Sequence, residues 1–371
     1  MNNMTPATVN VSNVTSLNVA FQKAIDELLL SYDSRMPSAL PIPTGSGGWW
    51  IGANAWTAIT LKDVRTRDQH NRKLMYSVLA HATAASSATF ELNSFNDDQA
   101  WWALWACEAA HYDGAPYDPR WLSPAEGAWD RISSTWTDEC GGGVVWDRSR
   151  AAGQGKKAIP NVLLMQLSSK LYELTRHLKY LQMAERTWAW LGVSGLIRGD
   201  GLLADATRCE QPRYNESCRG RMNWATYSYN TGVLIGALSN LYFTTRNATY
   251  LQAARVHAAA AIGSSAFHDA RGVIHEGCNC GKSGTACCED DGGDGVEFRG
   301  PFVRGLGALY EVDRDPAIRK IIQTTMRSAL QRSCSDAWQF GTNWSGPAGR
   351  LTTLTQVPAL DLLAASAAVL E

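Results

Sequence analysis

The fold is decided by a stretch that occurs twice: residues 171–184 read LYELTRHLKYLQMA, and residues 241–254 read LYFTTRNATYLQAA. In each copy the pattern predicts a helix that ends near the Thr-Arg pair, a short turn, and a second helix that begins near the Tyr-Leu pair. A degenerate third copy occupies residues 309–322 and reads LYEVDRDPAIRKII. A helical hairpin that repeats about every 70 residues is typical of a solenoid or a toroid.

The sequence outside the repeat continues the same alternation of helices and short loops. Apolar residues recur at helical spacing in residues 17–29, 50–64 and 72–84, which predicts three further helices. Ser123 and Pro124 resemble the start of another helix, as a cap and a proline in the first turn.

Strand signals are few, and the best short candidate, residues 143–146, lies in a loop. The chain length fits about six hairpins. We therefore predict an all-α fold, an (α/α)6 barrel whose inner helices are more apolar than its outer helices. No interdomain linker is visible, so we expect one domain over residues 1–371, with residues 1–16 as a loosely ordered N-terminal extension.

The composition argues against a nucleic-acid-binding or membrane-spanning protein. The 371 residues carry a formal net charge of −1 and 19% of them are charged, so no basic surface is indicated. No apolar run reaches the length that spans a bilayer. The 15 tryptophans favour a carbohydrate ligand, because sugar rings stack on flat aromatic faces, although tryptophan also fills ordinary cores.

Nine cysteines, together with several Asn-x-Ser/Thr sequons, favour a eukaryotic secreted protein that is extracellular or in the cell wall. The sequons are at Asn3, Asn10, Asn13, Asn215, Asn247 and Asn343. No signal peptide is visible at residues 1–4, and we infer that a leader has been removed.

The cysteines predict disulfides whose pairing stays open. One Gly-rich acidic loop holds four of them at a spacing that suits disulfides better than zinc: Cys278, Cys280, Cys287 and Cys288. Cys140, Cys209 and Cys218 predict a further bridge. The odd total leaves at least one free thiol, and Cys107 fits a small buried hydrophobic residue.

Residues 96–102, which read NDDQAWW, are the candidate for catalysis. We expect Asn96 to cap a helix and Gln99 to complete a capping box, with Asp97 and Asp98 in the first turn. Two neighbouring carboxylates beside indole rings suit cleavage of a sugar–sugar bond, with one as nucleophile and the other as acid/base. The alternative is structural, because acidic residues in a first helical turn are commonly there to complement the helix dipole.

An ordered series of short motifs resembles glycoside hydrolase family 76. The motifs are Trp49-Trp50, residues 96–102, Cys140–Gly143, Ala158–Asn161, Leu202–Asp205, Tyr229–Gly232 and Phe298–Arg304. The resemblance implies an (α/α)6 barrel and retaining endo-hydrolysis of α-1,6-mannan. It also implies that Asp97 is the nucleophile and Asp98 the general acid/base. The sequence itself contains no cofactor fingerprint and no convergent metal-binding pattern, so we expect no cofactor and no metal.

The chemistry implied by the resemblance sets expectations for the two acids. The helix start should keep Asp97 ionised, and the pKa of Asp98 should be raised by burial or by its charged neighbour. The two titrate as a coupled pair. The chain departs from the family pattern at Asp205-Ala206, where Asp-Gly is usual, and at Tyr227, where tryptophan is usual.

The predicted sugar contacts are Asn96, Gln99, Trp49, Trp50, Trp102, Asp205, Tyr227, Tyr229, Asn230 and Arg304. For several of them a structural role is the alternative. Asp205 is equally consistent with a loop cap, Tyr229 and Asn230 with packing at a helix start, and one of Trp49 and Trp50 with the core. The glycines at 141–143 are read as a close backbone approach or as a plain turn.

The sequence therefore predicts a secreted endo-α-1,6-mannanase, acting as a monomer on α-1,6-linked mannan or mannooligosaccharides. The first alternative is a transglycosidase of the same family that passes the glycosyl group to a sugar acceptor. The second is a mannan-binding protein without activity, against which the retained Asp97-Asp98 pair argues. A sugar epimerase is disfavoured because no histidines are suitably placed, and a uronyl hydrolase stays open.

Overall fold

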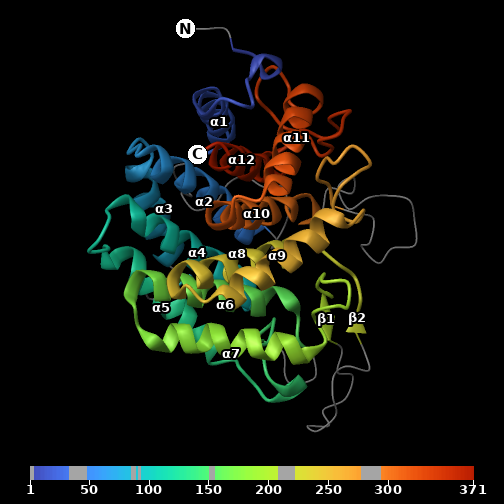
Figure 1. Ribbon diagram of the computed structural model, residues 1–371. Helices are drawn as coiled ribbons and strands as arrows, with labels where there is room; N and C mark the ends of the chain where they lie inside the picture. The colour runs from blue at the N-terminus through green and yellow to red at the C-terminus, as the bar shows by residue number, and fades with distance from the viewer. Residues whose placement is uncertain are drawn as a thin grey trace.

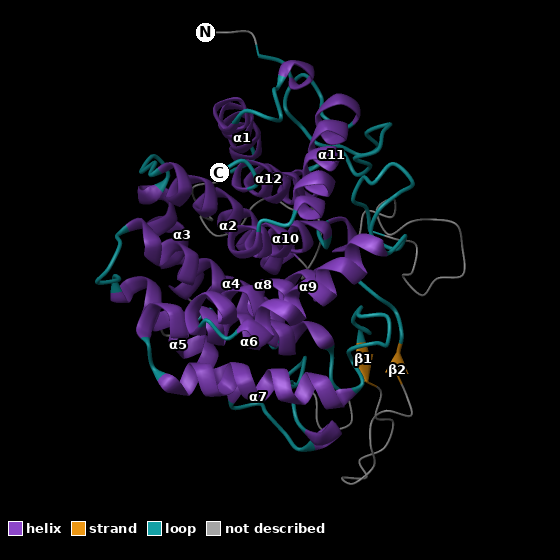
Figure 2. Cartoon of the chain, viewed as in Figure 1, coloured by secondary structure: helices purple, strands orange, loops and turns teal. Residues whose placement is uncertain are grey.

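The computed structural model describes residues 4–32, 48–84, 89–90, 93–149, 155–207, 222–276 and 294–371. Its α-helices are α1 (Val14–Leu29), α2 (Gly48–Thr66), α3 (Arg72–Ala84), α4 (Asn96–Ala109), α5 (Pro119–Ser133), α6 (Ala158–Thr175), α7 (Leu178–Ser194), α8 (Ser228–Thr245), α9 (Ala248–Gly263), α10 (Arg299–Asp313), α11 (Pro316–Arg332) and α12 (Thr353–Ala368). Short 3-10 turns are η1 (Pro6–Thr8), η2 (Ala110–Tyr112), η3 (Glu139–Gly141) and η5 (Asp294–Val296). Two strands, β1 (Ala206–Thr207) and β2 (Met222–Asn223), form a small antiparallel sheet at one edge of the molecule (Figure 2).

The even-numbered helices form a closed inner ring. Each packs against the next, from α2 through α4, α6, α8 and α10 to α12, and α12 packs back against α2. The helices α5, α7 and α9 cover α4, α6 and α8, while α1 and α11 cover α12 (Figure 1). A ring of helices inside a second layer of helices is an (α/α)6 barrel, so the predicted fold class is confirmed.

Burial differs between the two layers as the sequence predicted. Nearly every residue of α12 is buried, including the polar Gln356 and Asp361. The outer helix α11 buries one face, which carries Ile318, Ile322 and Met326, and exposes the other. An apolar helix surface on all sides is stable only where neighbours surround it, and the inner ring provides that surrounding.

The repeated sequence forms the same turn three times. Arg176, Arg246 and Arg314 follow the ends of α6, α8 and α10 with φ of 59°, 60° and 59°, the left-handed conformation that ends a helix. In each copy the arginine N–H donates to the carbonyl of a tyrosine four residues earlier, and the guanidinium lies over the tyrosine ring. The tyrosines are Tyr172, Tyr242 and Tyr310. The degenerate third copy is therefore a true structural repeat.

Helix starts follow capping chemistry, with one difference from the prediction. Asp118 caps α5 by accepting from Arg120 N at 2.8 Å, and Pro119 is the first helical residue. The predicted start at Ser123 is wrong, because this earlier cap and proline already begin the helix and Pro124 lies inside it. The predicted strand at residues 143–146 is also absent from the described chain, where Val144 makes one isolated bridge.

Two glycines bring α8 and α10 unusually close. A Cβ atom at Gly305 would overlap the carbonyl group of Gly232, and one at Gly232 would overlap the backbone of Phe302. The helices therefore touch backbone to backbone, which no residue with a side chain allows at these positions.

The N-terminal segment is more regular than predicted. Residues 6–8 form η1, Val11 is buried, and Asn13 caps α1 by accepting from Ser16 N at 2.8 Å. Residues 4–16 are thus attached to the barrel, because their apolar side chains pack on it. None of the helices in the described ranges is both long and apolar enough to cross a membrane.

Candidate active site

Asp97 and Asp98 lie in the first turn of α4, as predicted, but the turn is not capped as predicted. The N-cap residue is Phe95, which has no side-chain capping bond, and Asn96 is the first helical residue. Asn96 is fully buried: its amide donates to Thr135 Oγ1 at 2.9 Å and to the Val145 carbonyl at 2.7 Å. These contacts attach neighbouring loops to the helix start, so Asn96 has a structural role and is not available to a sugar.

Asp97 is held from the loop that precedes α6. The indole Nε1 of Trp146 donates to Asp97 Oδ2 at 2.8 Å, and the Nζ of Lys157 lies 3.3 Å from the centroid of the Trp146 ring. The other oxygen, Oδ1, is buried and has no hydrogen-bond partner in the described part of the chain. The carboxylate therefore has one fixed oxygen and one that is poorly solvated.

Burial raises the pKa of Asp97 to about 6, while the hydrogen bond from Trp146 and the positive charge of Lys157 act in the opposite direction. The sequence predicted that the helix start would help to keep Asp97 ionised. Desolvation outweighs the helix start here, so the pKa of Asp97 lies above its ordinary value.

Asp98 points to a different partner. Its side chain is buried, and its Oδ2 accepts from the amide of Asn93. Gln99 follows on the same turn, where its Nε2 donates to the Asn93 carbonyl at 3.1 Å and its Oε1 is buried without a partner among the described residues. Asn93 thus positions both the second acid and the amide beside it.

An aromatic rim joins the starts of α2, α8 and α10. The rings of Tyr229 and Phe298 stack at 4.0 Å with an interplanar angle of 6°, and Tyr227 packs on both. Trp50 contacts Phe298 at 6.1 Å, while half-buried Trp49 stacks at 4.3 Å on Trp102. The rim presents partly exposed rings of the kind on which sugars stack.

The two neighbouring tryptophans have different surroundings. Trp50 is buried and Trp49 is half-buried, which confirms the expectation that one of them belongs to the core. Trp102 is fully buried, and its Nε1 donates to the Trp49 carbonyl at 3.0 Å. Trp102 therefore supports Trp49 from behind and is not itself a stacking surface.

Asp205 belongs to the same end of the barrel. Its Oδ2 accepts from Asn223 Nδ2 at 2.9 Å, and its backbone is bonded to Asn223, Ala225 and Ala158. Asp205 raises the pKa of both Tyr227 and Tyr229, and Asp97 adds to the effect at Tyr229, although burial is the largest cause for both. The acids and tyrosines at this end of the barrel are far apart in the sequence. They nevertheless lie close enough for the charges of the acids to raise the pKa of the tyrosines.

Several buried polar atoms at helix starts have no hydrogen-bond partner among the described residues. Both amide atoms of Asn230 and the hydroxyl of Thr231, in the first turn of α8, lack hydrogen-bond partners in the described ranges. The Nε1 of Trp49 and the Oδ1 of Asp97 share this state. Unsatisfied buried groups are costly, and a polar ligand could satisfy those at the starts of α2, α4 and α8. Other such atoms lie elsewhere in the described residues, for example on Glu173 and Ser366.

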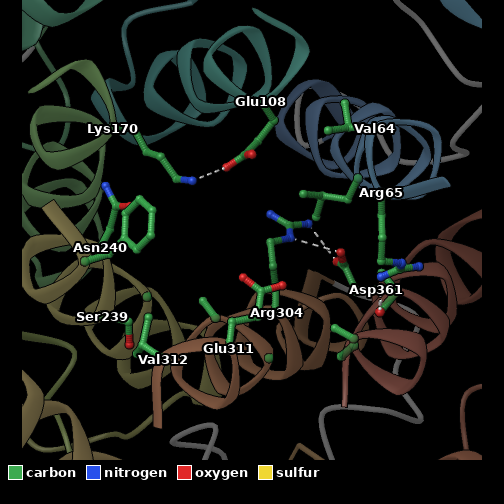
Figure 3. Close-up of a pocket in the computed structure, with 18 of the residues that line it drawn as sticks. Val64, Arg65, Glu108, Lys170, Ser239, Asn240, Arg304, Glu311, Val312 and Asp361 are labelled. Atoms are coloured by element: carbon green, nitrogen blue, oxygen red, sulfur yellow. Dashed lines mark hydrogen bonds and ion pairs between the residues drawn. The ribbon is translucent and has the colours of Figure 1, made fainter. Parts of the chain in front are cut away.

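Arg304 lies elsewhere. Its guanidinium donates to Asp361 at 2.9 and 2.7 Å (Figure 3). It also donates to Asn54 Oδ1 at 2.9 Å. It lines a cavity of about 460 Å³ formed chiefly by the C-terminal halves of the inner helices, where Lys170 and Glu108 form an ion pair at 2.9 Å. Because the acids lie at the N-terminal ends of the same ring, Arg304 is a structural ion-pair partner and its predicted contact with sugar is wrong.

Five residues of this region were not predicted from the sequence as parts of the site: Trp146, Lys157, Asn93, Asn223 and Phe298. Trp146 closes the apolar run at 143–146, whose composition indicated a strand and carried no sign of a contact with Asp97. Phe298 stands at the head of the motif that ends at Arg304, so the motif was informative although the wrong residue of it was chosen.

The glycines at 141–143 approach a protein ring. A Cβ atom at Gly143, whose φ is 84°, would lie 2.7 Å from the Trp190 indole. The loop is held by Lys156, whose ammonium donates to the Gly143 carbonyl at 2.7 Å. Gly142 and Gly143 therefore let the loop pack tightly on Trp190 of α7.

The cysteines agree with the prediction where they are described. Cys140 is disulfide-bonded, and Cys107 is a fully buried free thiol on α4. Cys334 is also free. The remaining predicted bridges and two sequons lie outside the described residues: Cys209, Cys218, Cys278, Cys280, Cys287, Cys288, Asn3 and Asn215.

The raised pKa of Asp97 makes a prediction for stability. An unfolded aspartate has a pKa near 3.9, and the folded value is about 6. The folded state therefore binds the proton more tightly, and stability is lost as the pH rises from about 4 to about 6. We expect Asp97→Asn to stabilise the fold by about 2 kcal/mol at pH 7 and to have little effect at pH 4.

Thermal unfolding at the two pH values measures this difference. Asp130→Asn is the matched control, because the side chain of Asp130 on α5 is 62% exposed. Equal shifts of the melting temperature at pH 7 and pH 4 would contradict the assigned pKa.

Comparison with known proteins finds similarity to curated mannan endo-1,6-alpha-mannosidases. Mannan endo-1,6-alpha-mannosidase DCW1 of Saccharomyces cerevisiae is 25% identical over 327 aligned residues, which cover 80% of this chain and 66% of that protein. Mannan endo-1,6-alpha-mannosidase DFG5 of the same yeast is 24% identical, with coverage of 80% and 65%. The chain thus spans slightly less than two thirds of the length of these relatives.

Solved structures share the fold. An α-1,6-mannanase of family 76 from Salegentibacter is 22% identical with a TM-score of 0.79, covering 96% of this chain and 100% of that one. Dfg5 from Chaetomium thermophilum, solved in complex with glucosamine, is 19% identical with a TM-score of 0.79 and coverage of 98% and 92%. The family model of Glycosyl hydrolase family 76 matches residues 16–369. Because this match includes both acids, the aromatic rim and all twelve helices but the first two residues of α1, the chain belongs to glycosyl hydrolase family 76.

Proposed function

We propose that the chain is a retaining endo-α-1,6-mannanase that hydrolyses the backbone of α-1,6-mannan. The observation that carries the proposal is the adjacent pair Asp97 and Asp98 at the start of α4, with an aromatic rim beside it. The relatives named as mannan endo-1,6-alpha-mannosidases support the substrate. The fold is shared with an inactive mannanase variant bound to α-1,6-mannotetrose, at 21% identity and a TM-score of 0.80.

In the first step, the Asp97 carboxylate attacks the anomeric carbon while Asp98 donates a proton to the glycosidic oxygen. The bond to the leaving sugar breaks, and a glycosyl ester forms on Asp97. In the second step, Asp98 takes a proton from a water molecule that attacks the same carbon, and Asp97 leaves as a carboxylate. Two inversions give net retention of configuration.

The other groups of the site bind rather than react. Trp49, Tyr227 and Tyr229 supply partly exposed rings, while Asp205, Asn230 and Gln99 offer polar atoms to sugar hydroxyls. Since Tyr227 stands where the family usually has tryptophan, its phenol replaces a larger stacking face.

We further propose that the protein is secreted and acts as a monomer through a single domain. The disulfide at Cys140 supports an oxidising compartment. Exposed Asn10, Asn13 and Asn247 lie in sequons on the described surface and are compatible with glycosylation there.

Digestion of linear α-1,6-mannan tests the proposal, with products followed by chromatography and by NMR of the anomeric proton at early times. We expect short α-1,6-mannooligosaccharides that appear first as the α-anomer, and no products from β-1,4-mannan. Mannose alone would indicate exo-action, and the β-anomer first would indicate inversion. Longer products formed only with an added acceptor would indicate a transglycosidase, and binding without products a mannan-binding protein.

A further inference from the structure

The segment that carries Trp146 is fixed to the start of α4 at several points. The Asn96 N–H donates to the Trp146 carbonyl at 2.9 Å, and Phe95 forms a backbone bridge with Asp147. The rings of Phe95 and Trp146 pack at 4.5 Å. These contacts hold the Trp146 indole in place, so it has little freedom to turn away from Asp97.

The hydrogen bond from this indole has a fixed sense. An indole N–H donates and never accepts, so it favours the ionised carboxylate over the protonated one. Its acceptor is Asp97 Oδ2 at 2.8 Å, so the hydrogen bond fixes the position of that oxygen.

Lys157 strengthens the donor. Its Nζ lies 3.3 Å from the centroid of the Trp146 ring, a close cation–π contact that withdraws electron density from the indole. Its backbone is fixed as the N-cap residue of α6, with its carbonyl accepting from Asn161 Nδ2 at 2.8 Å and a bridge to Ala206. The cation thus sits over the face of the Trp146 indole.

We propose that Trp146 and Lys157 are positioning residues for the nucleophile: the indole fixes Oδ2 of Asp97, and the ammonium group over the indole strengthens that hydrogen bond. The inference rests on the proposed function, in which Asp97 is the nucleophile. The pair acts in both steps, because Asp97 must be ionised to attack and must regain its charge when it leaves the sugar.

Several other charged or titratable groups lie around Asp97 and set the background for its titration. They are Asp98 on the same turn, Asp147 and Arg148 on the loop that carries Trp146, Asp205 beside β1, and Tyr227 and Tyr229 at the start of α8. Among the residues that the structure describes, Lys157 is the cation that lowers the pKa of Asp97.

The test measures Asp97 itself. In protein labelled with ¹³C at the aspartate carboxyl, the Asp97 signal is identified by its loss in Asp97→Asn and is titrated by NMR. We expect Trp146→Phe to raise the midpoint from about 6 by about one unit. Lys157→Met should raise it by less, and Lys157→Arg should restore it. An unchanged midpoint in folded Trp146→Phe would overturn the proposal.

Kinetics supply the second readout. On mannooligosaccharides we expect the acid limb of kcat/KM to shift upward with the titration, and kcat/KM at pH 5 to fall about 10-fold or more in Trp146→Phe. Lys179→Met is the matched control, because Lys179 on α7 lies 5.1 Å over the ring of Trp129 on α5, whose indole N–H donates to Ser168 Oγ at 2.7 Å and not to a carboxylate. If the native protein cleaves no mannan, the proposed function fails while the NMR titration still decides the role of the pair.

Discussion

Replacing Asp97 by asparagine is expected to lower kcat on α-1,6-mannan by on the order of 10⁴-fold or more, since it removes the nucleophile. The folded state should survive, because the amide is of equal size and relieves the cost of burying a charge next to an unsatisfied Oδ1. Rates of reducing-end formation, measured with protein of verified fold, give the ratio.

Added azide separates the roles of the two acids. In Asp98→Asn, azide enters on the covalent intermediate and should give an α-mannosyl azide, with kcat partly restored on a substrate with a good leaving group. In Asp97→Asn, azide replaces the missing carboxylate and should give the β-mannosyl azide. The same anomer from both variants, or full activity of Asp97→Asn, would refute the assignment.

Gly305→Ala is expected to destabilise the barrel by at least about 3 kcal/mol, or to prevent soluble expression. The added methyl group would occupy the space of the Gly232 carbonyl, so α8 and α10 must separate. Both helices carry site residues at their starts, namely Tyr229 and Asn230 on α8 and Phe298 before α10. Urea unfolding at equilibrium measures the loss.

The control substitution, Gly192→Ala, is expected to change the stability of the protein in the opposite direction. Gly192 lies in the outer helix α7, and a Cβ atom there meets nothing within 4 Å. Gly192→Ala should therefore stabilise the protein by about 0.5–1 kcal/mol, since alanine suits a helix better than glycine. A Gly305→Ala protein with an unchanged urea midpoint would show that the two helices can adjust at no cost.

The repeat and the acid pair carried most of what the sequence could predict. A Tyr at the fourth residue before an Arg recurs because that Arg ends three of the inner helices, α6, α8 and α10, so these hairpins can be recognised directly in the sequence. Asp97 and Asp98 stand out because neighbouring acids before tryptophans are rare. Such signals can be recognised in the sequence because the residues that produce them lie within one turn or one helix.

Long-range contacts were out of reach. Trp146 donates across 49 positions to Asp97, and Arg304 pairs with Asp361 across 57 positions. The sequence around Arg304 does not distinguish an arginine that binds sugar from one that pairs with a buried carboxylate. Which side chains lie at the same end of the barrel is determined only when the ring of inner helices closes.

Ring closure also fixes the order of events during synthesis. Arg65 near the end of α2 donates to the carbonyl of Ala364 in α12 at 2.7 Å, a contact between residues 299 positions apart. At the usual rate of translation the ribosome needs about 15–60 s to cover that interval. Until α12 emerges, the inner edges of α2 and α10 are exposed apolar surfaces that a chaperone, or the α12 of another chain, can bind.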